Sequence, residues 1–477
     1  MAVEIDRRSI WVLLVLKGLR PAFFLLLAAG FYYLIKMPAP EGLTPEGKNA
    51  IAVFLLCLVL WVSNIIPLAI TSLFAIVLVP LVDILPKEEV YGLFGNEAVF
   101  FILGAFILAG AVMHSGLSNR IALLIMDRFG SSPVRLLLSI YLLAALLSCF
   151  MSEHAVAAML FPIVFEIAKS LGLRPGRSTY AKMLFLSLAW GCVIGGIATF
   201  LGGARVPLAL GILKETTGRT IDFISYSVGV LPIVVIMLVF GYFLLTRFFS
   251  IDIESVEKAH EVLRRRIQSM GKVGYNEYMV GLILLVTVVA WATLGAKVGL
   301  ATVSLAAVVV LFVLRLVRWK DIEEYVNWGI ILMYGGAIIM GTALEKSGAA
   351  MWIAQSTIGG WVKEPWLAVA ILSLLALLFT EGISNAAVIA ILLPVGIGLT
   401  GGFNIDPVLV TYAIAVPAGL AFTLPLSTPA NAIAVSSTYL TVRDMAKAGV
   451  IMSITSWLVF NLVARFYWPL IGLGVAR

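Results

Sequence analysis

The chain has 477 residues, of which 61% are apolar and 12% are charged. Charged residues make up about 25% of an average protein, whereas here charge-poor runs of about 18 or more residues recur along the whole chain. This composition excludes a soluble globular protein and predicts an all-α membrane protein with many spans. The net charge of +7 comes from basic residues in short loops between apolar runs, which the positive-inside rule explains without nucleic-acid binding.

The first half of the chain is predicted to contain one re-entrant hairpin among its spans. An N-terminal span with its loop occupies residues 1–47. Residues 118–130 are amphipathic and basic, which is typical of a helix lying at the membrane surface. Glycines at 195–196 and the segment GGARVP (202–207) interrupt one of the later spans. The predicted elements are spans at 21–36, 48–66, 67–85 and 98–117, a hairpin at 133–172, the interrupted span at 182–214 and a span at 228–249.

The second half follows the same plan after a polar linker. Residues 250–274 are the only substantial polar stretch, and we expect them to form a cytoplasmic linker helix. A second interrupted span is broken at LPLSTPAN (424–431). The predicted elements are spans at 275–294, 298–316 and 327–346, a surface helix at 351–363, a hairpin at 365–400, the interrupted span at 408–435 and a last span at 448–470.

The two hairpins are copies of one another. Residues 133–162 and 365–394 align without a gap at an offset of 232 and share 11 identical residues in 30 positions, including the tip serines Ser152 and Ser384. Chance does not hold one register over such a length, so the chain contains an internal duplication.

The charge distribution predicts how the spans are oriented. With the N-terminus inside, and with each hairpin returning to the side from which it entered, the basic clusters fall on the cytoplasmic side. Few basic residues then lie in the predicted outer loops, which are 37–47, 86–97, 295–297 and 400–407. Each repeat, 48–249 and 275–477, contains five crossings and one hairpin. Because five is odd, the repeats are inverted, and one hairpin enters from each side.

The hairpins and the interrupted spans place non-helical backbone at membrane depth. Such backbone cannot face lipid, because each unpaired amide or carbonyl costs several kcal/mol. These segments therefore meet inside the protein around a polar cavity, as in secondary transporters, and form a transport domain beside a scaffold made of the remaining spans. The second arm of each hairpin begins just after Ser152 or Ser384, so its amides and positive helix end favour an anion at the tip.

Three stretches resemble the divalent anion–sodium symporter family of di- and tricarboxylate and sulfate carriers. They are WVSNIIPLAITSLFAIVLVPL (61–81), TEGISNAAVIAILLP (380–394) and STPANAIAVSSTYLTVRDMAKAG (427–449). The second and third are close to the family's Ser-Asn-Thr hairpin tip and Thr-Pro-Pro-Asn turn. The resemblance implies a homodimer whose transport domains slide elevator-fashion against the scaffold, with sodium as the coupling ion. We expect the chain in the lipid bilayer of a prokaryotic inner membrane.

The resemblance implies a sodium site in the second half. The tip triplet is Ser-Asn-Ala at 384–386, so the family's threonine is missing here. Asn431 is expected to brace the unwound turn. The implied sodium ligands are Thr380, Ser384, Asn385 and Ser427.

The first half departs from the family pattern at the corresponding site. Glu153 and His154 stand where the family has asparagine and threonine, and the family's Thr-Pro-Pro-Asn aligns with 203–206, which includes Arg205. Ionisable groups inside a membrane are costly and are functional candidates for that reason. If this site still binds sodium, the implied ligands are Ser148, Ser152, Glu153 and Gly202.

Four interpretations of these ionisable residues stay open. Arg205 supplies a fixed positive charge in place of sodium, paired with Glu153, or Glu153 and His154 titrate and couple transport to protons. Alternatively, Glu153 ligates sodium directly, or Glu153 and Arg205 form an ion pair that merely locks the hairpin.

The predicted substrate is a small divalent anion, a C4 dicarboxylate first and a citrate-like anion or sulfate next. The alternatives are a cation/proton antiporter using the three ionisable residues and an anion exchanger without a co-ion. No nucleotide loop or catalytic motif is recognised, so we predict neither an enzyme nor a cofactor. The predicted substrate-binding residues are Ser152, Glu153, His154, Arg205, Ser384, Asn385, Ala386, Thr428 and Pro429.

Two further residues carry an expectation. Glu381 aligns with Cys149 in the other repeat, and it is expected either at the substrate cavity or in contact with the scaffold. His260, in the linker, is expected to be solvated.

Overall fold

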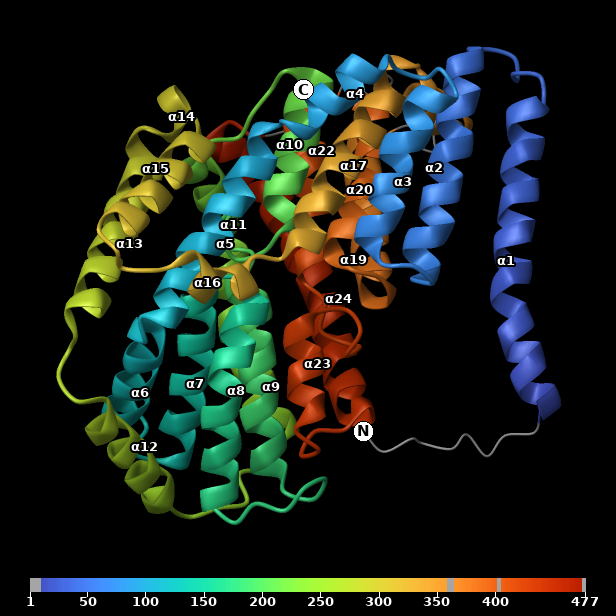
Figure 1. The fold of residues 1–477 in the computed structure, drawn as a ribbon. Helices are drawn as coiled ribbons and strands as arrows, with labels where there is room; N and C mark the ends of the chain where they lie inside the picture. Colours follow the sequence, from blue (N-terminus) through green and yellow to red (C-terminus); the bar gives the residue numbers. More distant parts are fainter. Residues whose placement is uncertain (1–9, 358–363, 401–404, 474–477) are drawn as a thin grey trace.

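A computed structural model describes residues 10–357, 364–400 and 405–473, and these residues form helices joined by loops (Figure 1). By length and composition, seven helical stretches among the described residues can cross a membrane. The chain is therefore an all-helical, multi-pass membrane protein. The seven stretches are Pro45–Ser63, Lys87–His114, Phe223–Phe248, Tyr275–Thr293, Trp328–Lys346, Pro365–Gly382 and Val442–Phe466.

The helices of the first half overlap the predicted spans, surface helix and hairpin arms. Most of the loop predicted at 86–97 forms the short helix α4, whose first turn carries Glu88 and Glu89 next to the positive end of the helix. The helices are α1 (Ile10–Lys36), α2 (Pro45–Ser63), α3 (Leu68–Leu81), α4 (Lys87–Phe94), α5 (Glu97–His114), α6 (Leu117–Phe129), α7 (Pro133–Ser148), α8 (Glu153–Ser170), α9 (Thr179–Gly195), α10 (Arg205–Thr217) and α11 (Phe223–Phe248).

The second half begins with the linker helix α12. The surface helix predicted at 351–363 corresponds to α18, and its residues 358–363 lie outside the described residues. The helices are α12 (Glu257–Met270), α13 (Tyr275–Thr293), α14 (Gly295–Val298), α15 (Leu300–Val313), α16 (Trp319–Ile322), α17 (Trp328–Lys346), α18 (Ala349–Thr357), α19 (Pro365–Gly382), α20 (Asn385–Gly398), α22 (Pro407–Ala415), α23 (Pro429–Ser436) and α24 (Val442–Phe466), with 3₁₀ turns at Glu323–Tyr325, Pro417–Gly419 and Trp468–Ile471.

The two hairpins keep their common register in the structure. Their first arms, α7 and α19, begin at Pro133 and Pro365, and their second arms, α8 and α20, begin at Glu153 and Asn385. Both pairs of starting residues differ by 232 positions, so the duplication seen in the sequence is also a duplication of the positions where these helices begin.

Each interrupted span has one half packed against each hairpin region. We call residues 196–204, between α9 and α10, the first break, and residues 420–428, between the turn after α22 and α23, the second break. α9 packs against α7 and α8, and α23 joins them there, whereas α10 packs against α20 and α22. Figure 1 accordingly shows α7, α8, α9 and α23 in one half of the molecule and α10, α20 and α22 in the other.

Small residues allow several of these helices to approach closely. A Cβ at Gly195 of α9 would collide with the carbonyl oxygen of Ala145 in α7. A Cβ at Gly336 of α17 would likewise collide with Ser72 of α3. Helices inside a membrane associate by van der Waals packing, which is favoured where glycine lets two backbones come together.

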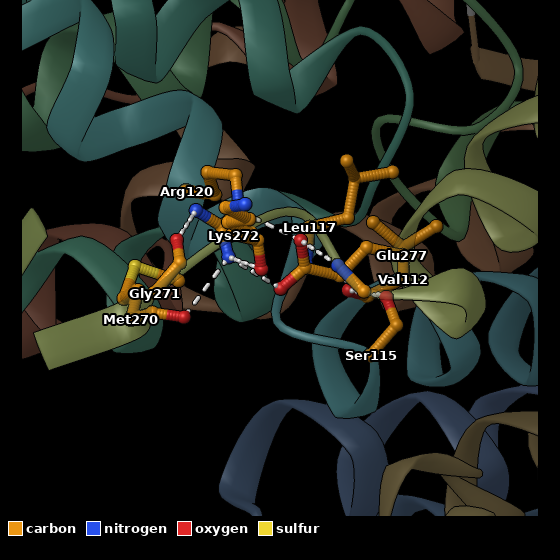
Figure 2. A network of polar contacts seen from close by, with 9 residues as sticks. Val112, Ser115, Leu117, Arg120, Met270, Gly271, Lys272 and Glu277 are labelled. Carbon is orange, nitrogen blue, oxygen red and sulfur yellow. Dashed lines mark hydrogen bonds and ion pairs between the residues drawn. The ribbon is translucent and has the colours of Figure 1, made fainter.

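A buried arginine fastens the surface helix α6 to the linker and to α13 (Figure 2). Arg120 pairs with the Glu277 carboxylate through Nε (2.6 Å) and Nη2 (3.1 Å). The same guanidinium donates to the carbonyl oxygens of Met270, Gly271 and Lys272 at the end of α12. All of these acceptors carry negative charge or lie at the negative end of a helix, so one side chain joins three elements.

The expectation of a solvated His260 is wrong, because its ring contacts the end of α6. Nε2 lies 2.7 Å from the Gly130 carbonyl oxygen, and Nδ1 lies 3.2 Å from a carboxylate oxygen of Asp127. The linker helix is thus bound to α6 along its length as well as at its end.

The loop that leads into α12 caps the first interrupted span. The Asp252 carboxylate accepts hydrogen bonds from the backbone amides of Thr179 (3.0 Å) and Tyr180 (2.8 Å) and from the Ser178 hydroxyl (2.9 Å). Burial raises the pKa of Asp252, but these hydrogen bonds outweigh burial, and the pKa lies below its usual value. The contact therefore contributes stability at neutral pH that is lost as the pH falls through this lowered pKa.

Gly195→Ala tests whether the close contact of α7 and α9 holds the fold. The added methyl group has backbone atoms of Ala145 as neighbours, so the helices must separate, and we expect a loss of about 1–3 kcal/mol of stability. Thermal unfolding of the purified protein in detergent measures the loss. Gly92→Ala on α4 is the matched control, because an added Cβ there meets no atom within 4 Å. Equal midpoints for the two variants would contradict the prediction.

Candidate functional site

Both hairpin tips are built around a serine that caps the second arm. The Ser152 hydroxyl accepts a hydrogen bond from the Ala155 amide (3.3 Å), and the Ser384 hydroxyl accepts one from the Ala387 amide (3.2 Å). Each serine thus marks the N-terminus of a helix that points its positive end at the tip.

The first break is occupied by the Arg205 side chain. Arg205 is 1% exposed, and its Nη2 donates a 2.7 Å hydrogen bond to the Gly196 carbonyl oxygen. Its Nη1 lies 3.8 Å from Oε2 of Glu153, and the Glu153 amide donates to the Gly202 carbonyl oxygen at 3.0 Å. The structure therefore brings together Glu153, Arg205 and Gly202, which the sequence had assigned to one cavity.

Arg205 also reaches the second interrupted span. A Cβ at Gly419 would collide with Arg205 Nε and Cζ, so a side chain at position 419 would displace the guanidinium. Three buried polar atoms around Arg205 have no hydrogen-bond partner among the described residues. They are Arg205 Nε, Glu153 Oε2 and the Ser148 hydroxyl oxygen.

Neutral oxygens lie at the corresponding place beside the second break. The Thr380 hydroxyl lies 2.7 Å from Asn385 Oδ1 and 2.8 Å from the Ala418 carbonyl oxygen. Thr380 is fully buried. A hydroxyl, an amide oxygen and a backbone carbonyl are the oxygen ligands that hard cations prefer. The structure thus brings together two of the predicted sodium ligands with one carbonyl, that of Ala418, which was not predicted.

Asn431 holds the second break from its far side, as expected. Its Nδ2 donates to the carbonyl oxygens of Ala421 (3.1 Å) and Leu424 (3.3 Å) and to the Ser427 hydroxyl (3.1 Å). The Ser427 hydroxyl in turn donates to the Leu424 carbonyl. Thr428 caps α23 by accepting from the Asn431 amide at 3.2 Å. Ser427 and Thr428 therefore shape the turn through these contacts.

The remaining predicted residues differ in exposure. His154 is exposed, and within the described residues no hydrogen bond or ion pair joins it to Arg205. Pro429 is exposed, and Ala386 is buried. Ser152 lies beside a small crevice between the first tip and α5, which Ala105 and Phe106 help to line.

Glu381 is the residue whose contacts the sequence left most open. Its carboxylate accepts hydrogen bonds from the backbone of the second break and from Ser453 of α24. The sequence carried one signal for this role: a carboxylate inside an apolar hairpin arm, directly after the predicted ligand Thr380. Gly419 was missed, and its only signal was a glycine within an interrupted span.

Comparison with known proteins agrees with this architecture. The chain matches the family described as the sodium:sulfate symporter transmembrane region over residues 21–473. It is 27% identical over 466 residues to the sodium-dependent dicarboxylate transporter SdcS of Staphylococcus saprophyticus, which covers 92% of this chain and 89% of the relative. The SdcS of Staphylococcus aureus is 28% identical over 483 residues, with 96% and 91% covered.

Two solved transporters share the fold. The Alcanivorax borkumensis YdaH transporter superposes with a TM-score of 0.54 at 15% identity, covering 81% of this chain and 89% of that chain. MtrF of Neisseria gonorrhoeae, described as an efflux pump, superposes with a TM-score of 0.56 at 12% identity, covering 92% and 96%. The family match spans nearly the whole sequence and confirms the resemblance found in the hairpin and turn motifs. The chain belongs to the sodium:sulfate symporter family, that of the divalent anion–sodium symporters, and is a transporter rather than an enzyme.

Proposed function

We propose that the chain is a secondary active carrier of a C4 dicarboxylate that couples to sodium through the second-half site, while Arg205 acts as a fixed cation in the first-half site. The observation that carries the proposal is the difference between the two breaks. Arg205 occupies the first, next to Glu153, and neutral oxygens of Thr380, Asn385 and Ala418 gather at the second.

The contacts of Arg205 support its role as a replacement for sodium. In carriers with interrupted helices, unwound carbonyls coordinate the coupling cation. Here the Gly196 carbonyl accepts from a guanidinium, which is always charged and cannot leave with the substrate. A carrier built in this way needs no sodium ion at the first site, because the guanidinium already occupies the place of the cation. This favours the fixed-charge interpretation over sodium ligation by Glu153.

The substrate is proposed to bind between the two hairpin tips. The positive N-terminal ends of α8 and α20 and the hydroxyls of Ser152, Ser384 and Thr428 suit the carboxylates of a short dicarboxylate. The names of the two SdcS relatives support a dicarboxylate before citrate or sulfate. The family match favours an anion carrier over the cation/proton antiporter.

The transport cycle is proposed to be an elevator motion in a homodimer. The hairpins and the interrupted spans would form the moving domain of two inverted repeats, and the remaining spans would form the scaffold. The membrane is proposed to be a prokaryotic inner membrane, with the N-terminus on its cytoplasmic side. This orientation puts the basic linker α12, with Arg264–Arg266, on the cytoplasmic side as well.

Restoring the family residues in the first half tests the role of Arg205. The double variant Glu153→Asn with Arg205→Pro removes both charges together, and proline suits position 205 because Arg205 is the first residue of α10. We expect the Hill coefficient for sodium in succinate uptake to rise above about 1, towards the two sites then available. Uptake into proteoliposomes under a sodium gradient measures it.

The single variant is the control for this experiment. Glu153→Asn alone leaves Arg205 buried without its counter-charge, which costs about 3–5 kcal/mol of stability. An unchanged Hill coefficient in a folded double variant would contradict the fixed-cation assignment. Wild-type uptake that is independent of sodium but driven by a proton gradient would indicate proton coupling instead. Wild-type uptake that is independent of sodium but requires an internal anion would indicate exchange.

The two hydroxyl residues at equivalent places in the repeats give a matched pair. Thr380→Val removes the second-site hydroxyl at nearly constant volume, and we expect the sodium concentration for half-maximal uptake to rise about tenfold, equivalent to about 1.4 kcal/mol. Ser148→Ala removes the first-half hydroxyl and should leave the sodium concentration for half-maximal uptake unchanged. Sodium titrations of initial uptake rates compare the two. A higher sodium requirement for Ser148→Ala, with no change for Thr380→Val, would instead indicate that the sodium site lies in the first half.

A further inference from the structure

We propose that Glu381 is a positioning residue that holds the second break in place beside the oxygens of Thr380, Asn385 and Ala418, which bind sodium. The inference rests on the sodium coupling proposed above. Glu381 is assigned no contact with sodium or substrate.

The Glu381 carboxylate accepts hydrogen bonds from three successive backbone amides and one hydroxyl. Oε1 accepts from the amides of Phe422 and Thr423, both at 3.1 Å, and Oε2 accepts from those of Thr423 (3.1 Å) and Leu424 (3.0 Å). The Ser453 hydroxyl of α24 donates to Oε1 at 2.9 Å. One side chain at the end of α19 thus joins the second hairpin, the second break and α24.

This arrangement requires a carboxylate. The second break is unwound at membrane depth, where unpaired amides are strongly unfavourable. A carboxylate only accepts hydrogen bonds and offers about four acceptor positions, which match the donors of Phe422, Thr423, Leu424 and Ser453. A glutamine would offer one oxygen and would turn its own N–H groups towards backbone N–H groups.

Holding the amides also sets the direction of the carbonyl oxygens. The amides of residues 422–424 belong to the same planar trans peptide groups as the carbonyls of residues 421–423, so these carbonyls point away from Glu381. Asn431 donates to the Ala421 carbonyl from the other side. The unwound segment is therefore held from two sides.

The neighbouring residue Thr380 connects the contacts of Glu381 to the proposed sodium site. Its hydroxyl contacts the Ala418 carbonyl just before the break and Asn385 at the start of α20. Thr380 and Glu381 are adjacent on α19, so loss of the Glu381 contacts frees the segment that directly follows Ala418, whose carbonyl is one of the proposed sodium ligands. We expect the affinity for sodium to fall, with less effect on the maximal rate.

The test compares sodium binding by Glu381→Gln with that by Glu364→Gln in the full-length protein. Glu364 is the exposed N-cap residue of the same helix, and its side chain makes no capping hydrogen bond. Thermal unfolding in detergent, titrated with sodium chloride against choline chloride, reports sodium binding independently of transport. We expect half-maximal stabilisation of Glu381→Gln to need about tenfold more sodium, the effect of losing about one charge-assisted hydrogen bond. Glu364→Gln should match the wild type.

Ser453→Ala supplies a milder variant in case Glu381→Gln does not fold. It removes one of the four donors, and we expect a smaller rise in the sodium requirement, with maximal succinate uptake at saturating sodium retained. A sodium curve of folded Glu381→Gln within twofold of the wild type would overturn the inference, and so would an unchanged Ser453→Ala curve if Glu381→Gln is unfolded. A wild-type protein without any sodium effect would instead refute the proposed sodium coupling itself.

Discussion

Backbone groups that cannot form helical hydrogen bonds inside a membrane impose the main constraint on this structure. The chain unwinds between α9 and α10 and again before α23, and the free amides and carbonyls there need partners within the protein. The first break presents carbonyls and receives the Arg205 guanidinium, whereas the second presents amides and receives the Glu381 carboxylate. The half-helices α10 and α23 pack against α20 and α8 of the two hairpins.

In the two repeats, the unwound backbone thus pairs with side chains of opposite charge, and these side chains come from different positions of the repeat. Arg205 is the first residue of the helix that follows the break it fills, and the equivalent residue of the second turn is Ala430. Glu381 belongs to a hairpin arm, and its counterpart is Cys149. The serine caps of the hairpin tips have meanwhile stayed the same in both copies. The duplication has therefore kept the geometry of the tips while the fixed charges beside them diverged.

The sequence predicted the features that depend on local pattern. Hydropathy located the spans, the constant offset located both hairpins, and the serines predicted where α8 and α20 begin. The pairing of Glu153 with Arg205 followed from aligning the repeats. Contacts between segments that lie far apart in the chain could not be predicted from these local patterns. Glu381 meets residues 422–424, and His260 meets the end of α6, across stretches that no periodicity relates. The short helix α4 was missed because eight residues carry too little apolar pattern to stand out.

The linker helix α12 contacts α6 on one side and α8 on the other, and the ion pairs on the two sides differ in strength. On one side, Arg120 is buried with Glu277, and separating such a pair is costly. On the other side, Arg266 meets Glu166 of α8 through side chains that are about 40% exposed, and a pair of that kind contributes little. A displacement of the first hairpin relative to α12 would therefore break the Arg266–Glu166 pair at little cost. The buried contacts of Arg120 would meanwhile keep the end of α12 attached to α6 and α13.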